Sequence, residues 1–269
     1  MSDLRTAIIL GVTADIGRGL SERLIGDGWN VVGLGRTLDR LQAVNRSPAL
    51  DVYRCELMDK GALAALVATL RTKGLRWDLL VSSVGTMEPI GRFFDIDFDA
   101  WERSISVNFT GQMRAIHALW PLRRPERIVD IMLLAGGGTN SPFRNYSAYC
   151  VSKIALIKMC ELIDDETPDA NAFIIGPGYT HTRIHQETLR AGPKAAGEEY
   201  NKVLALLEKE GTTIDDIYAH MRWCMAQGRG VAGGRNFSTV HDPWRGGGAA
   251  LAETLRRAPG AYRLRRQQP

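Results

Sequence analysis

Short apolar segments alternate with amphipathic ones along most of the chain, and this pattern restricts the fold more than any other feature of the sequence. A short apolar run flanked by turn residues is typical of a strand buried on both faces of a parallel sheet. The intervening segments have helical spacing, with Leu63, Leu66, Val67 and Leu70 on one face. We therefore expect one doubly wound α/β domain of the Rossmann type over residues 1–269, a parallel sheet with helices on both faces. The expected strands are residues 7–10, 30–34, 52–55, 79–82, 128–134, 173–175 and a strand-like run at 236–240, with helices at 17–26 and 59–73.

Composition excludes several classes of protein. Of the 269 residues, 45% are hydrophobic and 24% are charged, as in an ordinary globular domain. No apolar run reaches the roughly 18 residues of a membrane span, and the first residues lack the shape of a signal peptide. The cysteines show no metal-ligand spacing, so we expect them to be reduced in a cytoplasmic protein with no metal site. They are Cys55, Cys150, Cys160 and Cys224.

The net charge of +4 comes partly from the C-terminal end of the chain. This region has one aromatic residue, Tyr262, and no folded recognition motif, so we do not expect a nucleic-acid partner. Residues 258–269 are expected to form a basic, flexible tail. The arginines of the region are Arg256, Arg257, Arg263, Arg265 and Arg266.

The first expected strand runs into a glycine-rich turn that opens the first helix and reads Gly11-Val12-Thr13-Ala14-Asp15-Ile16-Gly17. Glycine is required where the backbone adopts a positive φ or approaches a phosphate closely. The N-terminus of the following helix presents free N–H groups to an anion. A turn of this kind between the first strand and the first helix predicts a dinucleotide site.

The end of the second expected strand bears on the choice of dinucleotide. An acidic residue here would bind the ribose 2′-hydroxyl of NAD, whereas this chain has Gly35 and then Arg36. A guanidinium suits a 2′-phosphate, which it binds through two hydrogen bonds. We therefore expect NADP(H), with NAD(H) as the alternative.

Tyr149 and Lys153 are four residues apart and so share one face of a helix. A nearby ammonium stabilises a phenolate. At about 4 Å and an effective dielectric of about 20, the attraction is roughly 4 kcal/mol, which would lower a tyrosine pKa from about 10 toward about 7. Such a tyrosine is a usable general acid or base. Taken alone, the pair also fits an exposed contact on a helix surface.

Taken together, these motifs make the chain similar to the classical short-chain dehydrogenase/reductases over nearly its full length. The glycine-rich turn falls on the family's TGxxxGxG motif, with Leu10 for its threonine and Asp15 for its middle glycine, and Tyr149-xxx-Lys153 falls on YxxxK. The resemblance implies that Asn108 helps to position the lysine. It also implies a set of cofactor-binding residues: Gly11, Thr13, Asp15, Ile16, Gly17, Arg36, Glu56, Leu57, Ser83, Gly85, Tyr149, Lys153, Pro177, Gly178 and Thr182.

The family's catalytic serine has no counterpart here. Gly136 stands at its place, or Ala135 if the loop carries one extra residue. That serine donates a hydrogen bond to the substrate oxygen, and loss of one such donor costs about 10²–10³ in rate. Three outcomes stay open: a side chain of the loop donates instead, the backbone of the three glycines donates, or ordinary carbonyl reduction is lost. The candidate side chains are Thr139, Asn140 and Ser141. We favour replacement, because the tyrosine, the lysine and the asparagine remain.

Residues 182–211 have a helical pattern that is interrupted by Gly192-Pro193 and Gly197, and we expect them to form a substrate lid. The arginines and histidines in or near this region are candidates for binding a phosphate or carboxylate. They are Arg144, His181, Arg183, His185 and Arg235, and Asn145 lies beside Arg144. The glycine loop together with the late run His241-Asp242-Pro243-Trp244 resembles a branch of the family that acts in sugar or polysaccharide pathways. This resemblance implies a keto-sugar or sugar-nucleotide substrate.

The resemblance implies an NAD(P)(H)-dependent oxidoreductase that interconverts a ketone and a secondary alcohol, with a small-molecule substrate. Tyr149 would transfer the proton, and Lys153 would lower its pKa and hold the nicotinamide ribose. Two alternatives stay open: a nucleotide-binding regulator or scaffold with reduced activity, and a redox-neutral dehydratase or epimerase. In many relatives the helices around residues 101–120 and Tyr149 form dimer interfaces, so a homodimer or homotetramer is implied.

Overall fold

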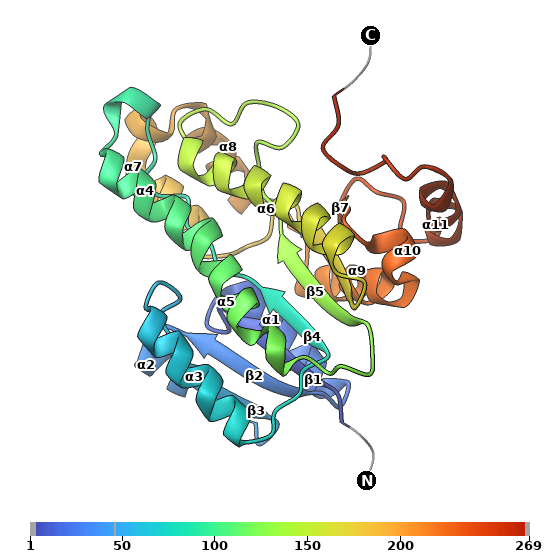
Figure 1. Cartoon of the computed structure of the whole chain (residues 1–269). Coiled ribbons are helices and arrows are strands. Elements are labelled where there is room, and N and C mark those ends of the chain that lie inside the picture. Colours follow the sequence, from blue (N-terminus) through green and yellow to red (C-terminus); the bar gives the residue numbers. More distant parts are fainter. Residues whose placement is uncertain (1–3, 46, 267–269) are drawn as a thin grey trace.

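The structure, a computed structural model, describes residues 4–45 and 47–266. A seven-stranded parallel sheet forms its centre, with the order β3-β2-β1-β4-β5-β6-β7 (Figure 1). The direction of winding reverses between β1 and β4, so the expected doubly wound Rossmann-type fold is confirmed. The strands are β1 (Thr6–Leu10), β2 (Asn30–Gly35), β3 (Leu50–Arg54), β4 (Leu79–Ser82), β5 (Val129–Leu134), β6 (Ala170–Gly176) and β7 (Asn236–Ser238).

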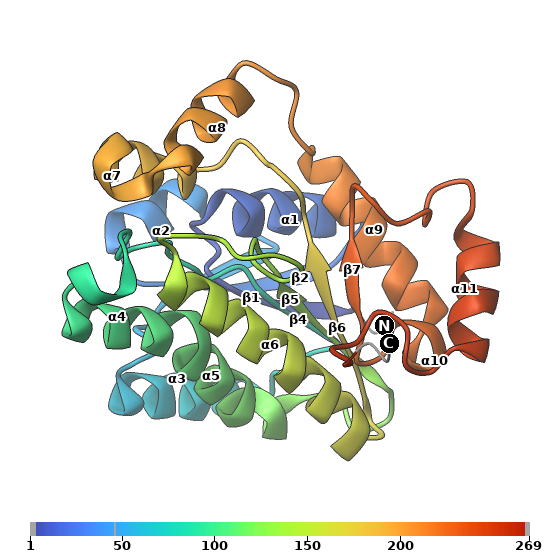
Figure 2. The same ribbon diagram turned by 90° about the horizontal axis from the view of Figure 1, so that it is seen from above.

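Helices cover both faces of the sheet. Figure 2 shows α1 and α9 on one side of the strands and α3, α5 and α6 on the other. The helices are α1 (Asp15–Gly26), α2 (Leu38–Val44), α3 (Lys60–Thr72), α4 (Phe98–Ile105), α5 (Gly111–Leu119), α6 (Ser147–Glu166), α7 (His185–Ala196), α8 (Glu198–Leu207), α9 (Ile214–Gln227), α10 (Arg229–Ala232) and α11 (Gly248–Arg257). Two short 3₁₀ turns, Phe93–Asp95 and Trp120–Leu122, complete the set with a π-helical segment, Ser106–Thr110.

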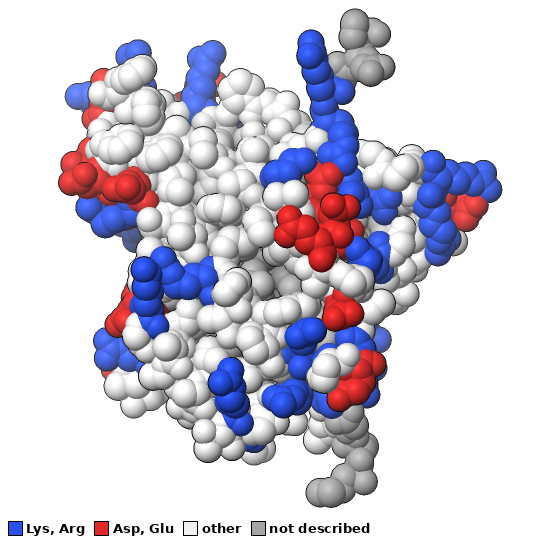
Figure 3. Space-filling model, in the orientation of Figure 1, with Lys and Arg blue, Asp and Glu red and all other residues white. Residues whose placement is uncertain are grey.

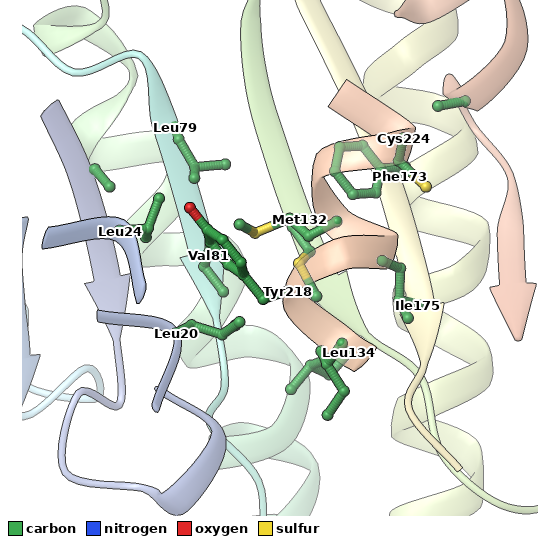
Figure 4. Packing of buried hydrophobic residues seen from close by; sticks show 14 of the residues in the cluster. Leu20, Leu24, Leu79, Val81, Met132, Leu134, Phe173, Ile175, Tyr218 and Cys224 are labelled. Atoms are coloured by element: carbon green, nitrogen blue, oxygen red, sulfur yellow. The ribbon is translucent and has the colours of Figure 1, made fainter. Parts of the chain in front are cut away.

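Each face of the sheet buries its own hydrophobic core, because side chains alternate along a strand. On β1, Ala7 and Ile9 join the core beneath α1 and α9, whereas Ile8 and Leu10 join the core beneath α3, α5 and α6. Figure 4 shows the first core, where Tyr218 of α9 lies beside Met132 of β5, and Cys224 of the same helix lies beside Phe173 of β6. Strands buried on both faces explain the near-continuous apolar runs in the sequence.

The helical region expected around residues 101–120 is continuous but not uniform. Between α4 and α5 the chain widens into the π-helical segment, which contains Asn108. π-Helical segments occur mostly as single turns within α-helices, and they are frequently found at functional sites. Downstream, α7 contains a non-helical residue at Gly192, with φ of 75°, and Gly197, with φ of 64°, separates α7 from α8.

The last described residues contact the body of the protein. Arg263 and Arg265 form ion pairs with Glu161 of α6, and Leu264 packs against the core beneath that helix. The 18% exposed side chain of Arg263 also lies 3.7 Å from Asp164. Residues 258–266 of the expected flexible tail are therefore held by charge pairs and apolar contact, while residues 267–269 lie outside the described residues.

Surface charge and helix hydropathy are ordinary in the described part of the chain. Basic and acidic side chains are interspersed over the face in Figure 3, with wide neutral areas between them. Across residues 4–45 and 47–266, no helix is both long and apolar enough to cross a membrane. The same residues contain no cluster of three or more His, Cys, Asp or Glu side chains able to hold a metal ion.

Candidate active site

A cavity of about 1050 Å³ lies at the carboxyl ends of the central strands. Its wall includes the turn after β1 at Gly11, Arg36 after β2, Ser83 after β4, Ala135 after β5 and Gly176 at the end of β6. This is where open α/β sheets bind their ligands, next to the point at which the strand order reverses.

The glycine-rich turn is held closely against the end of β4. Gly11 has a φ of 80°, which favours glycine. The Ser83 hydroxyl donates to the carbonyls of Leu10 at 2.9 Å and Gly11 at 3.0 Å. A side chain at Gly17 would overlap both the Gly11 carbonyl and the Ser83 hydroxyl. Gly17 therefore permits the close packing of the turn against the end of β4.

Asp15 replaces a glycine of the motif, and its side chain is turned toward the segment before α7. Its Oδ2 accepts the backbone N–H of Arg183 at 2.7 Å and lies 3.4 Å from Nε of the same residue. The Arg183 guanidinium also donates to the Thr13 carbonyl. The negative charge at the turn is thus paired with a guanidinium from a distant part of the chain.

Two arginines line the cavity beside the ends of β2 and β3. Arg36 was expected there, and Arg40 joins it from α2. The two are four residues apart at the start of a helix, a spacing that the sequence displays and that would have indicated Arg40 as well. Glu56 and Leu57 line the same region, and the Leu57 carbonyl accepts a hydrogen bond from Arg114 at 3.2 Å.

Tyr149 and Lys153 lie on α6 and line the cavity together. Their exposed fractions are 6% and 4%. The Lys153 Nζ donates to the Leu134 carbonyl at 2.8 Å and lies 5.5 Å from the centre of the Tyr149 ring. Burial lowers the pKa of Lys153 to about 8. Burial also raises the pKa of Tyr149 well above its ordinary value of 10.

The expected lowering of the Tyr149 pKa toward 7 is therefore wrong in this structure. The removal of the phenol from water disfavours the phenolate. The ammonium that was expected to offset this effect is bonded to the Leu134 carbonyl rather than to the phenol oxygen. The position of Tyr149 and Lys153 on one face of a helix therefore does not by itself determine whether the pKa of Tyr149 is raised or lowered.

Asn108 is fully buried and does not reach the cavity wall. Its amide clamps Thr86 through two hydrogen bonds: Oδ1 accepts the Thr86 N–H and Nδ2 donates to the Thr86 carbonyl, each at 2.8 Å. The Asn108 carbonyl accepts from the amide of Gln112. A Cβ at Gly85 would lie 3.8 Å from the Lys153 Nζ and 3.9 Å from the Asn108 Oδ1. The asparagine and the lysine thus both lie beside Gly85 in the loop after β4.

The loop after β5 contributes backbone rather than hydroxyl groups to the cavity. Gly136 and Gly137 line it, whereas Thr139, Asn140 and Ser141 are not part of the described wall. The Thr139 hydroxyl donates to the Gly136 carbonyl at 3.2 Å. The structure therefore does not bring the three expected serine substitutes to the tyrosine.

The segment after β6 closes another side of the cavity. Pro177, Gly178 and Thr182 line it as expected. Gly178 has a φ of 77°, and a side chain there would overlap Val240. The tight turn brings the segment across the strand ends and leads it into α7.

Glu187 is a wall residue that the sequence patterns did not indicate. Its Oε2 accepts hydrogen bonds from the Thr86 hydroxyl at 3.0 Å, the Met87 N–H at 2.5 Å and the Glu88 N–H at 3.3 Å. Burial raises its pKa above the ordinary value. These contacts tie the first turn of α7 to the loop that Asn108 clamps.

Three buried polar atoms in the wall have no hydrogen-bond partner among the described residues: the Tyr179 hydroxyl, the Thr180 Oγ1 and the His185 Nδ1. Buried polar groups of native proteins are almost always paired, with protein, water or ligand. These atoms are therefore buried polar groups of the wall residues that lack a partner among the described residues.

Not every candidate for anion binding reaches the cavity. Arg183 and His185 line it, whereas Arg144, Asn145 and His181 are outside the described wall. The prediction is wrong for Arg235, which is 3% exposed and donates to carbonyls of its own surroundings, including those of Val231 and Leu255. Its guanidinium is a structural crosslink.

Comparison with known proteins agrees with this geometry. A family model described as short chain dehydrogenase matches residues 5–192, and the chain belongs to this family of oxidoreductases, whose nucleotide-binding fold it shares. It is similar to benzil reductase ((S)-benzoin forming) IRC24 of Saccharomyces cerevisiae, with 29% identity over 226 residues that cover 78% of this chain and 85% of the relative. An NADPH-dependent pterin aldehyde reductase of Arabidopsis thaliana is 21% identical over 185 residues, or 67% of this chain and 76% of the relative.

Among solved structures, a short chain dehydrogenase/reductase from Saccharomyces cerevisiae superposes with a TM-score of 0.81. The alignment covers 93% of this chain and 99% of that one at 19% sequence identity, so it bears on the fold alone.

Proposed function

We propose that this protein is an NADP(H)-dependent reductase that converts a ketone to a secondary alcohol and can run in reverse. One observation carries the proposal: a single cavity is lined by the glycine-rich turn, by Tyr149 and by Lys153. A nucleotide-binding regulator would need the turn, but it would not need a buried proton donor and a buried ammonium in the same wall. The residues present fit the cofactor, because Gly11 and Gly178 leave backbone free of side chains where it must approach closely.

The proposed roles follow from the state of each group. When bound, the nicotinamide supplies or accepts the hydride. Because burial keeps the Tyr149 phenol protonated, it is poised to donate a proton to a carbonyl oxygen. Lys153, with a pKa of about 8, carries its charge at neutral pH and stabilises the phenolate that remains after the proton has left. Asn108 acts through the loop at Thr86, which it holds in place.

The preference for NADP(H) rests on Arg36 and Arg40. Both are exposed side chains in the cavity wall, and no acidic residue precedes them at the end of β2. Two guanidiniums bind a 2′-phosphate well, because each donates paired hydrogen bonds to phosphate oxygens. The Arabidopsis relative, whose name gives NADPH as its cofactor, agrees with this choice.

The walls near Tyr149 favour an apolar carbonyl compound. Met87, Phe143 and Ile184 line the cavity and belong to one small hydrophobic cluster with Tyr149. Such a surface gains free energy when it covers aromatic or aliphatic groups. The yeast relative is named for benzil, a ketone with two aromatic rings. A keto-sugar or sugar nucleotide is the alternative, supported by the unpaired polar atoms of Tyr179 and His185.

The test is NADPH oxidation at 340 nm with a panel of aromatic ketones, aliphatic ketones, keto-sugars and sugar nucleotides. We expect turnover with at least one apolar ketone and a loss of at least about 10²-fold in kcat for Tyr149→Phe, as for loss of a general acid. Substrate conversion without net NADPH consumption would indicate the redox-neutral alternative. NADPH binding with no conversion of any compound would favour the regulator.

We also propose a homodimer that is formed through the region around α4. Phe94 and Phe98 there are 93% and 60% exposed, although they are large and apolar. Neighbouring exposed aromatic side chains of this kind usually mark an interface. Light scattering at micromolar concentration should give twice the chain mass for the wild type and a monomer for Phe94→Asp/Phe98→Asp. A monomeric wild type would refute this.

A further inference from the structure

Gly136 is the glycine of its loop whose nearest neighbour is the side chain of Tyr149. A Cβ built on Gly136 would lie 2.6 Å from Cζ and 2.8 Å from Cε1 of the Tyr149 ring, and closer still to the hydroxyl oxygen. Non-bonded carbon atoms normally approach to about 3.5 Å. The space that any side chain at position 136 would need is already filled by the phenol of Tyr149.

The backbone at Gly136 does not itself require glycine. Its φ is outside the positive range, unlike that of Gly138, whose φ is 90°. A positive φ is therefore not the reason for a glycine at residue 136. The three atoms nearest to a Cβ at Gly136 all belong to the side chain of Tyr149.

Away from the cavity, the phenol is packed against other aromatic rings. The Phe143 ring meets the Tyr149 ring edge-on, with centroids 6.3 Å apart, and stacks on Tyr146 at 4.3 Å. Tyr149 is 6% exposed, and Tyr146 is fully buried. A group added at Gly136 would have to displace this packed set of rings, and packed interiors resist such shifts.

We propose that Gly136 is a positioning residue: the absence of a side chain at this point admits the Tyr149 hydroxyl into the corner of the cavity beside the β5 loop. A serine hydroxyl at position 136 would therefore compete with the phenol for the same space, and the phenol supplies the hydroxyl donor there. This inference rests on the proposed function, because it assigns the donor role to Tyr149.

The activity of the Gly136→Ser variant distinguishes two explanations for the glycine at this position. If the protein has simply lost a donor, a serine would restore it and raise the reductase rate. If Gly136 makes room for the phenol, serine and alanine at this position both displace the hydroxyl by about 1 Å. A misplacement of that size lowers kcat by roughly 10²-fold. We expect this loss for both variants, with the Kd for NADPH within about threefold of the wild-type value.

Gly137→Ala is the matched control, because it makes the same chemical change one residue further along the loop. Its Cβ would lie 3.3 Å from the ring of Phe143, a much milder contact than the overlap of a Gly136 Cβ with Tyr149. We expect its kcat to fall by less than tenfold. A Gly136→Ser variant as active as the wild type, or more active, would refute the proposal.

A stability measurement tests the same contact without turnover. Gly136→Ala should lower the Tm by roughly 2–6 °C in the wild-type background, as overpacking does. In a Tyr149→Ala background the loss should fall below about 1 °C, because nothing remains to be displaced. Such a double-mutant cycle isolates the coupling between the two positions. Equal losses in both backgrounds would contradict the inference.

The two sets of results separate this inference from the proposed function. If Tyr149→Phe kept full turnover, the proposed function would fail whatever the cycle gave. If Tyr149→Phe abolished turnover and Gly136→Ser raised it, the proposed function would stand and the inference about Gly136 would fail.

Discussion

The backbone N–H of Arg183 donates to Oδ2 of Asp15 at 2.7 Å, which joins the segment before α7 to the first turn of α1. The Arg183 guanidinium lies on the same carboxylate. The residue that departs from the glycine-rich motif is therefore matched by a cation from the opposite side of the cavity. A carboxylate at a helix N-terminus would otherwise compete with the phosphates of a dinucleotide.

Arg183→Ala should weaken NADPH binding, because it removes the cation that pairs with Asp15. The free carboxylate would then repel the phosphates of the cofactor at the glycine-rich turn. We expect the Kd to rise about tenfold, which corresponds to roughly 1.4 kcal/mol. Asp15→Asn/Arg183→Ala should recover much of the loss, since the repulsive charge is gone. Fluorescence titration with NADPH measures both, and Lys194→Ala on the exposed side of α7 serves as the control. An unchanged Kd for Arg183→Ala would show that Arg183 does not offset the charge of Asp15 when NADPH binds.

Arg36→Ala/Arg40→Ala should reduce the preference for NADPH over NADH. The loss of contacts to a 2′-phosphate weakens only the phosphorylated cofactor, so the ratio of the two kcat/KM values should fall by roughly 10–100-fold, a change of about 1.4–2.8 kcal/mol. The NADH value should change little. Arg76→Ala, an exposed arginine outside the described cavity wall, should leave the ratio as it is. A ratio unaffected by the double substitution would place the 2′-phosphate elsewhere.

Glu187→Ala should loosen the first turn of α7 from the loop after β4. The substitution removes the acceptor of the Met87 N–H and the Thr86 hydroxyl, and a buried donor left unpaired costs about 1–3 kcal/mol. We expect the Tm to fall by roughly 2–6 °C, and hydrogen exchange to rise in residues 86–88 and α7. Glu187→Gln keeps an acceptor oxygen and should lose less. Protection equal to that of the wild type in Glu187→Ala would show that these contacts do not hold the helix.

The exposed Glu198 of α8 provides the control for that experiment. Glu198→Gln changes the same charge on a neighbouring helix and should leave both the Tm and the exchange pattern within error.

The lowered pKa of Lys153 predicts a dependence of stability on pH. In the folded chain the ammonium loses its proton near pH 8, whereas in the unfolded chain it does so near 10.5. Between these values the unfolded state binds more protons, so this group makes the free energy of unfolding rise as the pH rises. By about pH 9.5 the gain should be roughly 2 kcal/mol.

Urea unfolding of the wild type and of Lys153→Met between about pH 7 and about pH 9.5 measures this effect. The methionine variant lacks the titrating group, so the difference in unfolding free energy should move in favour of the wild type as the pH rises. A difference that stays constant over this range would mean that Lys153 titrates as a solvated lysine does.

The sequence by itself predicted the features whose cause is local. Apolar runs predicted the strands with ends at most three residues from those observed, because burial on both faces leaves a near-continuous apolar pattern. The turn from Gly11 to Gly17 and the pair Tyr149 and Lys153 were found because each depends on residues that lie within one or two turns of the backbone. Most of the expected cofactor residues line the cavity for the same reason: they follow strand ends.

Only the tertiary structure decided how these groups are held and in which state. The contacts of Glu187 with Thr86 and of Arg183 with Asp15 join residues 101 and 168 positions apart, and no local pattern encodes such pairs. The sign of the Tyr149 pKa shift depended on desolvation by the packed rings and on the Leu134 carbonyl that engages Lys153. The overlap that excludes a side chain at Gly136 likewise exists only once α6 packs on the β5 loop. Distance and burial are properties of the packed chain. The sequence therefore predicted which residues line the site, whereas the tertiary structure determined their contacts and their pKa values.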